Sequence, residues 1–175
     1  QLEPALAAYA DDFVGALYSP EDELGDPHRF CRALLDVLVH RYGVTLRTGV
    51  RVADIGTSGG QVIGFAANGE QIVADHILIC AGLGSASLLR RFGLGSALMP
   101  MKGYSITAPP GAHPPKTSIT DVARKLVFCP LQGAIRIAGL AELGEHNPAL
   151  AADRLAVMVD SAQAAFPEMA QYAAP

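Results

Sequence analysis

The chain has 175 residues, 50% of them hydrophobic, and a formal net charge of −4 from 13 Lys and Arg against 17 Asp and Glu. This length and hydrophobic content allow one ordinary domain or two partial ones and exclude a disordered tail. No basic run is interleaved with aromatic residues, which argues against a nucleic-acid partner. Because no stretch approaches the roughly 20 apolar residues that span a bilayer, and no signal peptide is evident at the start, we expect a cytoplasmic protein.

The first 50 residues predict one short strand and one well-delimited helix. Residues 14–18 are strand-like and are followed by Ser19-Pro20. Asp26 is a good N-cap before Pro27, and Gly43 ends the helical pattern. The apolar positions between them repeat at helical spacing, at Phe30, Leu34, Leu35, Leu38 and Val39. We therefore expect a helix with one buried face.

The next segments predict a small sheet and a strand-turn-helix unit. Ser58-Gly59-Gly60 and Asn68-Gly69 are turn signals, and Asn-Gly is the strongest hairpin signal in the chain. Residues 77–80 are continuously apolar, as in a strand of a parallel sheet that is covered on both faces. The order of the predicted helices and strands matches half of a doubly wound α/β domain. The expected strands are 44–47, 50–55, 61–66, 71–73 and 77–80, and the expected helix is 85–92.

After Pro100 the pattern changes to strands linked by Pro- and Gly-rich loops. Residues 101–108, 125–129 and 134–140 predict an antiparallel layer. A final helix over about 149–165 places Leu150, Leu155, Val159 and Ala162 on one apolar stripe and ends at Phe166-Pro167. The fold expected for the whole chain is therefore mixed α/β and α+β.

Few residues suggest metal or nucleophilic chemistry. Cys31, Cys80 and Cys129 form no CxxC pair, so we expect buried, reduced thiols. The five histidines have no partner four residues away, and no metal site is expected. The run from Gly82 to Ser87 resembles a G-x-G-x-x-G phosphate loop but has Ser87 in place of the third glycine. A turn that faces a cofactor and a plain packing turn both fit it.

Two side chains in the predicted antiparallel layer are candidates for contacts with a ligand. Tyr104, in Lys102-Gly103-Tyr104-Ser105, could approach a ligand or close the core with its hydroxyl at the rim. Arg136 lies in an otherwise apolar strand, where it must be paired or hold an anion if it faces inward, whereas strand alternation equally allows it to face water.

Two strings are the most specific in the chain, Lys102-Gly103-Tyr104-Ser105-Ile106-Thr107 and Ala138-Gly139-Leu140-Ala141-Glu142. Glu3-Pro4-Ala5-Leu6 and residues 74–82 support them. Together these strings resemble the middle section of the D-amino acid oxidase family, and within it the bacterial D-amino acid dehydrogenases of the small-subunit type. The resemblance covers essentially the whole chain.

The resemblance implies an FAD enzyme with two domains. Residues 26–97 would be the second half of a glutathione-reductase-type flavin domain, and residues 1–25 and 98–175 an antiparallel substrate domain. Such enzymes transfer hydride from a D-amino acid to flavin, release a 2-oxo acid and pass electrons to a respiratory acceptor, in the cytoplasm or at the inner membrane. Tyr104 and Arg136 would lie near flavin and substrate. The residues carried over to the ADP moiety are Val52, Cys80, Ala81, Gly82 and Gly84.

Two parts of the family pattern have no counterpart in the chain: the N-terminal G-x-G-x-x-G loop and a C-terminal Gly-Leu-Arg-Pro segment. We therefore expect an internal piece of a longer enzyme, which alone neither holds FAD tightly nor turns over. Two alternatives remain open at this point. One is a glycine or sarcosine oxidase-like enzyme, and the other is a non-catalytic scaffold subunit that keeps the flavoprotein fold.

Overall fold

The computed structural model describes residues 2–94 and 98–172, and the contacts within it divide the chain into two units. The sheet unit comprises residues 1–32 and 101–175, and the meander unit comprises residues 33–100. The expected domain limits at residues 1, 97 and 175 lie outside the described residues. The assignment of flavin and substrate roles to the two units stays a prediction.

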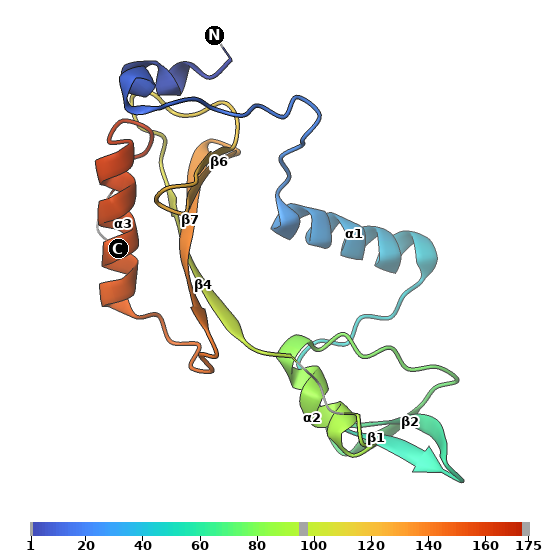
Figure 1. Ribbon diagram of the computed structural model, residues 1–175. Coiled ribbons are helices and arrows are strands. Elements are labelled where there is room, and N and C mark those ends of the chain that lie inside the picture. The colour runs from blue at the N-terminus through green and yellow to red at the C-terminus, as the bar shows by residue number, and fades with distance from the viewer. Residues whose placement is uncertain (1, 95–97, 173–175) are drawn as a thin grey trace. The chain divides into compact units, whose positions relative to one another are not determined.

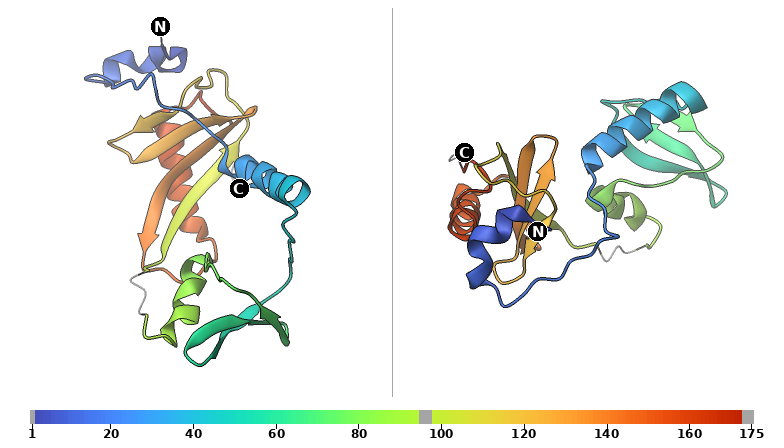
Figure 2. Two further views of the ribbon diagram at one scale, coloured as in Figure 1. Left: turned by 90° about the vertical axis from the view of Figure 1, so that its right-hand side faces the viewer. Right: turned by 90° about the horizontal axis from the view of Figure 1, so that it is seen from above.

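The sheet unit is built on a four-stranded antiparallel sheet with the strand order β4-β7-β6-β5. Helix α3 (Ala152–Ala165) lies along one face of this sheet (Figures 1 and 2). The antiparallel layer predicted after Pro100 is therefore confirmed, and the short β5 is an addition that the sequence analysis did not predict. The strands are β4 (Met101–Ala108), β5 (Ile119–Asp121), β6 (Leu126–Leu131) and β7 (Ala134–Leu143).

The core of the sheet unit lies between α3 and the sheet. Phe166, at the end of α3, packs edge-on against Phe128 with ring centroids 5.1 Å apart. The predicted stripe of α3 is buried at Leu155, Val159 and Ala162, whereas Leu150 is exposed and precedes the helix. The sheet contributes every second side chain to this core, as strand geometry requires, including Tyr104, Phe128, Ile135 and Ile137.

The N-terminal segment is attached to the sheet unit through a carboxylate. Glu3 accepts hydrogen bonds from the backbone of Ala5, Lys116 and Thr117 and from the Thr117 hydroxyl. It is followed by η1 (Pro4–Asp12), a 3₁₀ helix that was not predicted. The strand predicted at 14–18 is wrong, because the segment is exposed and pairs with no described strand.

Helix α1 (Pro27–Tyr42) confirms the helix predicted between Asp26 and Gly43. The Asp26 carboxylate accepts the backbone N–H groups of His28 and Arg29, as an N-cap should. Gly43 ends the helix at a φ of +67°. The predicted buried face is not found, since none of the helix residues is buried and Phe30 is 66% exposed. Helical periodicity marks an apolar face but does not supply the element that covers it.

The meander unit confirms the predicted three-stranded meander, with the order β1-β2-β3. Its strands are β1 (Val52–Ser58), β2 (Gln61–Ala67) and β3 (Glu70–Val73). Both predicted turns have two residues in the left-handed region, Gly59 with Gly60 and Asn68 with Gly69. That conformation joins antiparallel strands with the correct twist.

Two further predicted strands of the meander unit, at 44–47 and 77–80, are wrong. Both segments are extended but pair with no described strand. A parallel strand needs neighbours that supply its hydrogen bonds, and all the strand pairs in the described residues are antiparallel. The chain then continues through η2 (Gly82–Gly84) into α2 (Ser85–Arg90), which confirms the start of the helix predicted at 85–92.

The cysteines differ from expectation in their burial. Cys31 and Cys80 are exposed and Cys129 is half-buried, and all three are free thiols. Cys31 lies on the uncovered helix α1, and Cys80 lies on the extended segment before η2. Of the described helices, none has the length and apolar character needed to cross a membrane.

Candidate functional site

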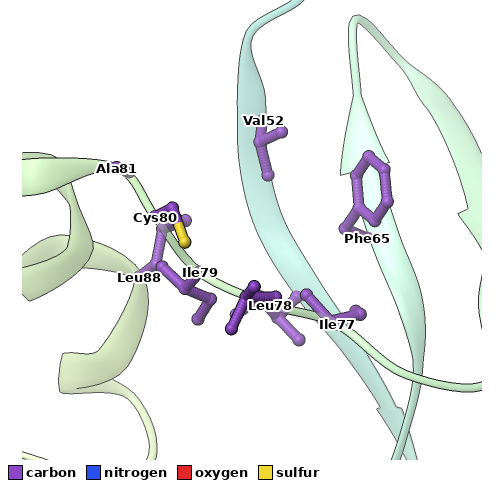
Figure 3. A pocket seen from close by; sticks show the side chains of 9 residues that line it. Val52, Phe65, Ile77, Leu78, Ile79, Cys80, Ala81 and Leu88 are labelled. Carbon is purple, nitrogen blue, oxygen red and sulfur yellow. The ribbon is translucent and has the colours of Figure 1, made fainter. Parts of the chain in front are cut away.

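An apolar pocket of about 240 Å³ lies in the meander unit (Figure 3). One wall is the meander, through Val52 and Phe65, and the opposite wall is the extended segment that precedes η2. Leu88 of α2 adds a further side chain. The complete lining is Val52, Ile55, Phe65, Ile77, Leu78, Ile79, Cys80, Ala81 and Leu88.

Two polar contacts hold the walls of this pocket in place. The Ser85 hydroxyl accepts the backbone N–H of Ala81 at 3.2 Å, which fixes the turn into α2. Arg91, directly after α2, forms an ion pair with Asp54 on β1. The guanidinium, hydrogen-bonded to that carboxylate, holds the pKa of Asp54 below its ordinary value. The ion pair thereby links strand β1 to the end of helix α2, and the Ser85 bond acts within the turn before that helix.

The structure brings three of the five cofactor candidates together. Val52, Cys80 and Ala81 line the pocket, whereas Gly82 and Gly84 follow it in η2 and do not. Gly82 has a φ of +52°, which suits glycine at the point where the chain turns toward α2.

The chemistry of the pocket suits a flat, weakly polar ring. None of its lining side chains is charged, and the thiol of Cys80 is the most polar among them. Apolar walls with a few nearby backbone groups are typical of sites for heteroaromatic ligands. A phosphate would find no cationic side chain in this lining. The residues therefore fit the adenine end of a dinucleotide and do not fit its pyrophosphate.

A second candidate site lies on the sheet unit, on the face opposite α3, which we call the open face. Arg136 projects from β7 on this face and is exposed. Its guanidinium donates to the Thr107 hydroxyl at 2.9 Å and to the Ser105 hydroxyl at 2.6 Å. On the other side of β7, Cys129 is the strand partner of Arg136, and its sulfur lies 3.3 Å from the Ser118 hydroxyl. A polar row thus crosses three strands of the sheet.

Tyr104 lies on the other face of the same sheet. Its side chain belongs to the core under α3 and is 2% exposed. Its hydroxyl donates to the Glu142 carboxylate at 2.8 Å. The structure therefore does not bring Tyr104 and Arg136 together: one side chain faces the helix, and the other faces away from it.

Glu142 is the centre of a charged cluster at the end of the sheet. Lys102 Nζ lies 3.1 Å from one carboxylate oxygen, and Arg154 Nε of α3 lies 3.3 Å from the other. The hydrogen bond from Tyr104, followed by the bond from Lys102 and the charges of Lys102 and Arg154, holds the pKa of Glu142 below its ordinary value. Tyr104 and Glu142 in turn raise the pKa of Lys102. The cluster contains two cations and one carboxylate and joins β4, β7 and α3.

Ser105, Thr107 and Glu142 were not predicted as partners of the candidate side chains. Ser105 and Thr107 lie two residues apart on one strand, so their side chains must share a face. That alternation was visible in the sequence. The pairing of β4 with β7, which places both hydroxyls beside Arg136, was not.

The family model described as "FAD dependent oxidoreductase" (DAO) matches residues 1–174 of the chain. Three curated relatives, from Pseudomonas aeruginosa, Ralstonia nicotianae and Paramagnetospirillum magneticum, are 39%, 34% and 36% identical over 169, 171 and 169 residues. The matches cover 95%, 94% and 95% of this chain. The first two relatives are named D-amino acid dehydrogenase 2, and the third D-amino acid dehydrogenase.

The chain spans about 40% of the length of these relatives. No solved structure matches it significantly.

Proposed function

We propose that this chain, which belongs to the DAO family of FAD-dependent oxidoreductases, is part of a dehydrogenase that converts D-amino acids to 2-oxo acids. The observation that carries the proposal is the match to proteins named D-amino acid dehydrogenase along almost the whole chain. A fold alone does not determine a substrate. The polar open face around Arg136 supports an amino acid, because its carboxylate would complement a guanidinium.

The family indicates FAD as the cofactor, and the apolar pocket fits the adenine ring. We place that ring between Val52 on one side and Cys80 and Ala81 on the other, with the turn at Gly82 and Gly84 beside the ADP moiety. In this proposal the meander unit is part of a flavin domain of the glutathione-reductase type. When bound, FAD supplies the hydride acceptor for the substrate α-carbon.

Arg136 is our candidate for contact with the substrate. Its guanidinium is exposed on the open face and is held by two neutral hydroxyls. Tyr104 faces the core, so we propose that it acts indirectly, by fixing Glu142 and Lys102 and hence the start of β4. The 2-imino acid formed by oxidation would hydrolyse to the 2-oxo acid and ammonia, and electrons would pass to a respiratory acceptor.

The test uses the full-length, flavin-loaded protein and three amines: D-alanine, L-alanine and sarcosine. We expect D-alanine to bleach the flavin absorbance without oxygen and to yield pyruvate and ammonia with an artificial electron acceptor. We expect L-alanine and sarcosine to do so far more slowly. Faster reduction by sarcosine would assign the protein to the secondary-amine oxidases. A protein that binds flavin but is reduced by none of the three would contradict the proposal.

A further inference from the structure

We propose that Ser105 and Thr107 are positioning residues that hold the Arg136 guanidinium on the open face, ready to receive a carboxylate. This inference deepens the proposed function and rests on it, because the carboxylate is that of the amino acid substrate. It assigns a role to two hydroxyls that do not themselves touch the substrate.

The strand register explains why these two hydroxyls reach Arg136. Thr107 is the direct strand partner of Arg136, and Ser105 is the partner of Ala138, two residues farther along β7. All four side chains therefore lie on the same face. Thr107 bonds one terminal nitrogen of the guanidinium and Ser105 bonds the other. Because both nitrogens are held, the plane of the guanidinium is fixed rather than free to rotate.

The charge of Arg136 is not neutralised by any described residue. The strands of the four-stranded sheet carry two cationic side chains, Lys102 and Arg136. Lys102 has Glu142 at 3.1 Å, whereas Arg136 has no carboxylate within ion-pair distance in residues 2–94 and 98–172. Two of its five N–H donors go to hydroxyls, which leaves three for an external acceptor.

Neutral hydroxyls are well suited to this arrangement. An aspartate at either position would orient the guanidinium equally well but would cancel its charge and compete with an incoming anion. A hydroxyl accepts one N–H bond and leaves the positive charge available. Orientation in advance also spares the substrate the entropic cost of fixing a long, flexible side chain. The geometry therefore favours a small carboxylate that can approach the sheet from the open face.

The experiment compares variants of the full-length, flavin-loaded protein. Ser105→Ala and Thr107→Val, singly and together, remove the hydroxyls, and Thr107→Ser keeps the hydroxyl at position 107. The matched control is Thr120→Val on β5, because Thr120 is exposed on the same face and its side chain makes no hydrogen bond in the described residues. The readouts are KM and kcat for D-alanine, the dissociation constant of pyruvate from its perturbation of the flavin spectrum, and the temperature of unfolding.

We expect the double variant to raise KM and the pyruvate dissociation constant roughly tenfold. This is the effect expected when the carboxylate loses one hydrogen bond to the charged guanidinium at an exposed site. The kcat should change by less than about threefold, since the loss concerns binding. Thr107→Ser and Thr120→Val should behave like the wild type, with flavin content and unfolding temperature unchanged in all variants.

Three outcomes distinguish failure of the inference from failure of the proposed function. A wild-type protein that does not oxidise D-alanine refutes both. A wild-type protein that oxidises D-alanine, together with a folded double variant that binds pyruvate as tightly, refutes the positioning role alone. A Thr107→Ser variant as impaired as Thr107→Val would also refute it, because the hydroxyl would then not be the group that matters.

Discussion

Replacing Glu3 should release the N-terminal segment from the sheet unit. One carboxylate oxygen, Oε2, accepts from Lys116 N, Thr117 N and Thr117 Oγ1 at 2.9, 2.8 and 2.8 Å, and the other accepts from Ala5 N at 3.1 Å. Three of these four donors lie more than 100 residues away along the chain, so a single side chain closes a very long loop. Glu3→Ala leaves all four donors without their protein acceptor.

The size of the effect follows from these bonds and from their partial exposure. A hydrogen bond to a charged group contributes about 1.5–3 kcal/mol when well shielded, and water can replace part of the loss at this half-buried site. We therefore expect Glu3→Ala to cost about 2 kcal/mol in the local opening of the 116–117 loop. Glu3→Gln keeps one oxygen acceptor but loses the charge and one bond, so about 1 kcal/mol is expected.

The effect should depend on pH in a defined direction. Partial burial acts to raise the pKa of Glu3, but the hydrogen bonds from Thr117, Ala5 and Lys116 outweigh it and lower the pKa below its ordinary value of 4.5. A lowered folded pKa means that the stabilisation is fully present above that ordinary value and is lost as the pH falls through the folded one. The wild type and Glu3→Gln should therefore converge in acid.

Amide hydrogen exchange of peptides that contain Lys116 and Thr117, measured on the full-length protein, is the direct assay. At neutral pH a loss of about 2 kcal/mol should speed exchange about 30-fold in Glu3→Ala. Glu23→Gln is the matched control, because Glu23 is exposed and has no partner in the described residues. Unchanged exchange in Glu3→Ala would refute the reasoning, as would a gap between wild type and Glu3→Gln that widens in acid.

Two further substitutions test the meander unit. Ala81→Phe places a ring in the pocket that we assign to adenine, so the full-length protein should lose FAD on dialysis while keeping its far-ultraviolet circular dichroism; retained FAD would argue against the assignment. Gly64→Ala brings a Cβ onto the backbone carbonyl of Ile72 in β3, and we expect a loss of at least about 2 kcal/mol in stability. Denaturant unfolding measures it, and an unchanged midpoint would contradict the predicted overlap.

The parts of the fold that were predictable are those with local causes. Asp26 and Pro27 start α1, Asn68-Gly69 turns β2 into β3, and residues 101–108 form β4 with the predicted ends. Each of these depends on side chains a few residues apart. The failures at 14–18, 44–47 and 77–80 are segments whose apolar pattern needs a partner strand, and pairing is not a local property. The 3₁₀ helix after Glu3 depends on neither pattern and was missed.

The candidate site likewise has residues that could be predicted from the sequence and relationships that could not. Val52, Cys80 and Ala81 were nominated from family resemblance, and the structure places them in one pocket. The faces of Tyr104 and Arg136 could not be compared from the sequence. Alternation predicts which residues of one strand share a face, but comparing the faces of residues on two strands requires the pairing register. Here the register is interrupted, because Gly103 pairs with Ala141 while Ser105 pairs with Ala138.

That interruption separates two charges carried by one strand. Opposite the single residue Tyr104, β7 contains Gly139 and Leu140, which is the signature of a β-bulge. Before the bulge Arg136 faces outward, and beyond it Glu142 faces the helix, although both are even-numbered positions on one strand. Deleting one residue at the bulge would restore regular alternation and leave Glu142 facing the helix, whereas a regular strand that kept the extra residue would turn Glu142 to the open face, where a carboxylate would neutralise the guanidinium. The bulge, and not the spacing of the two residues along the chain, therefore keeps the Glu142 carboxylate away from Arg136.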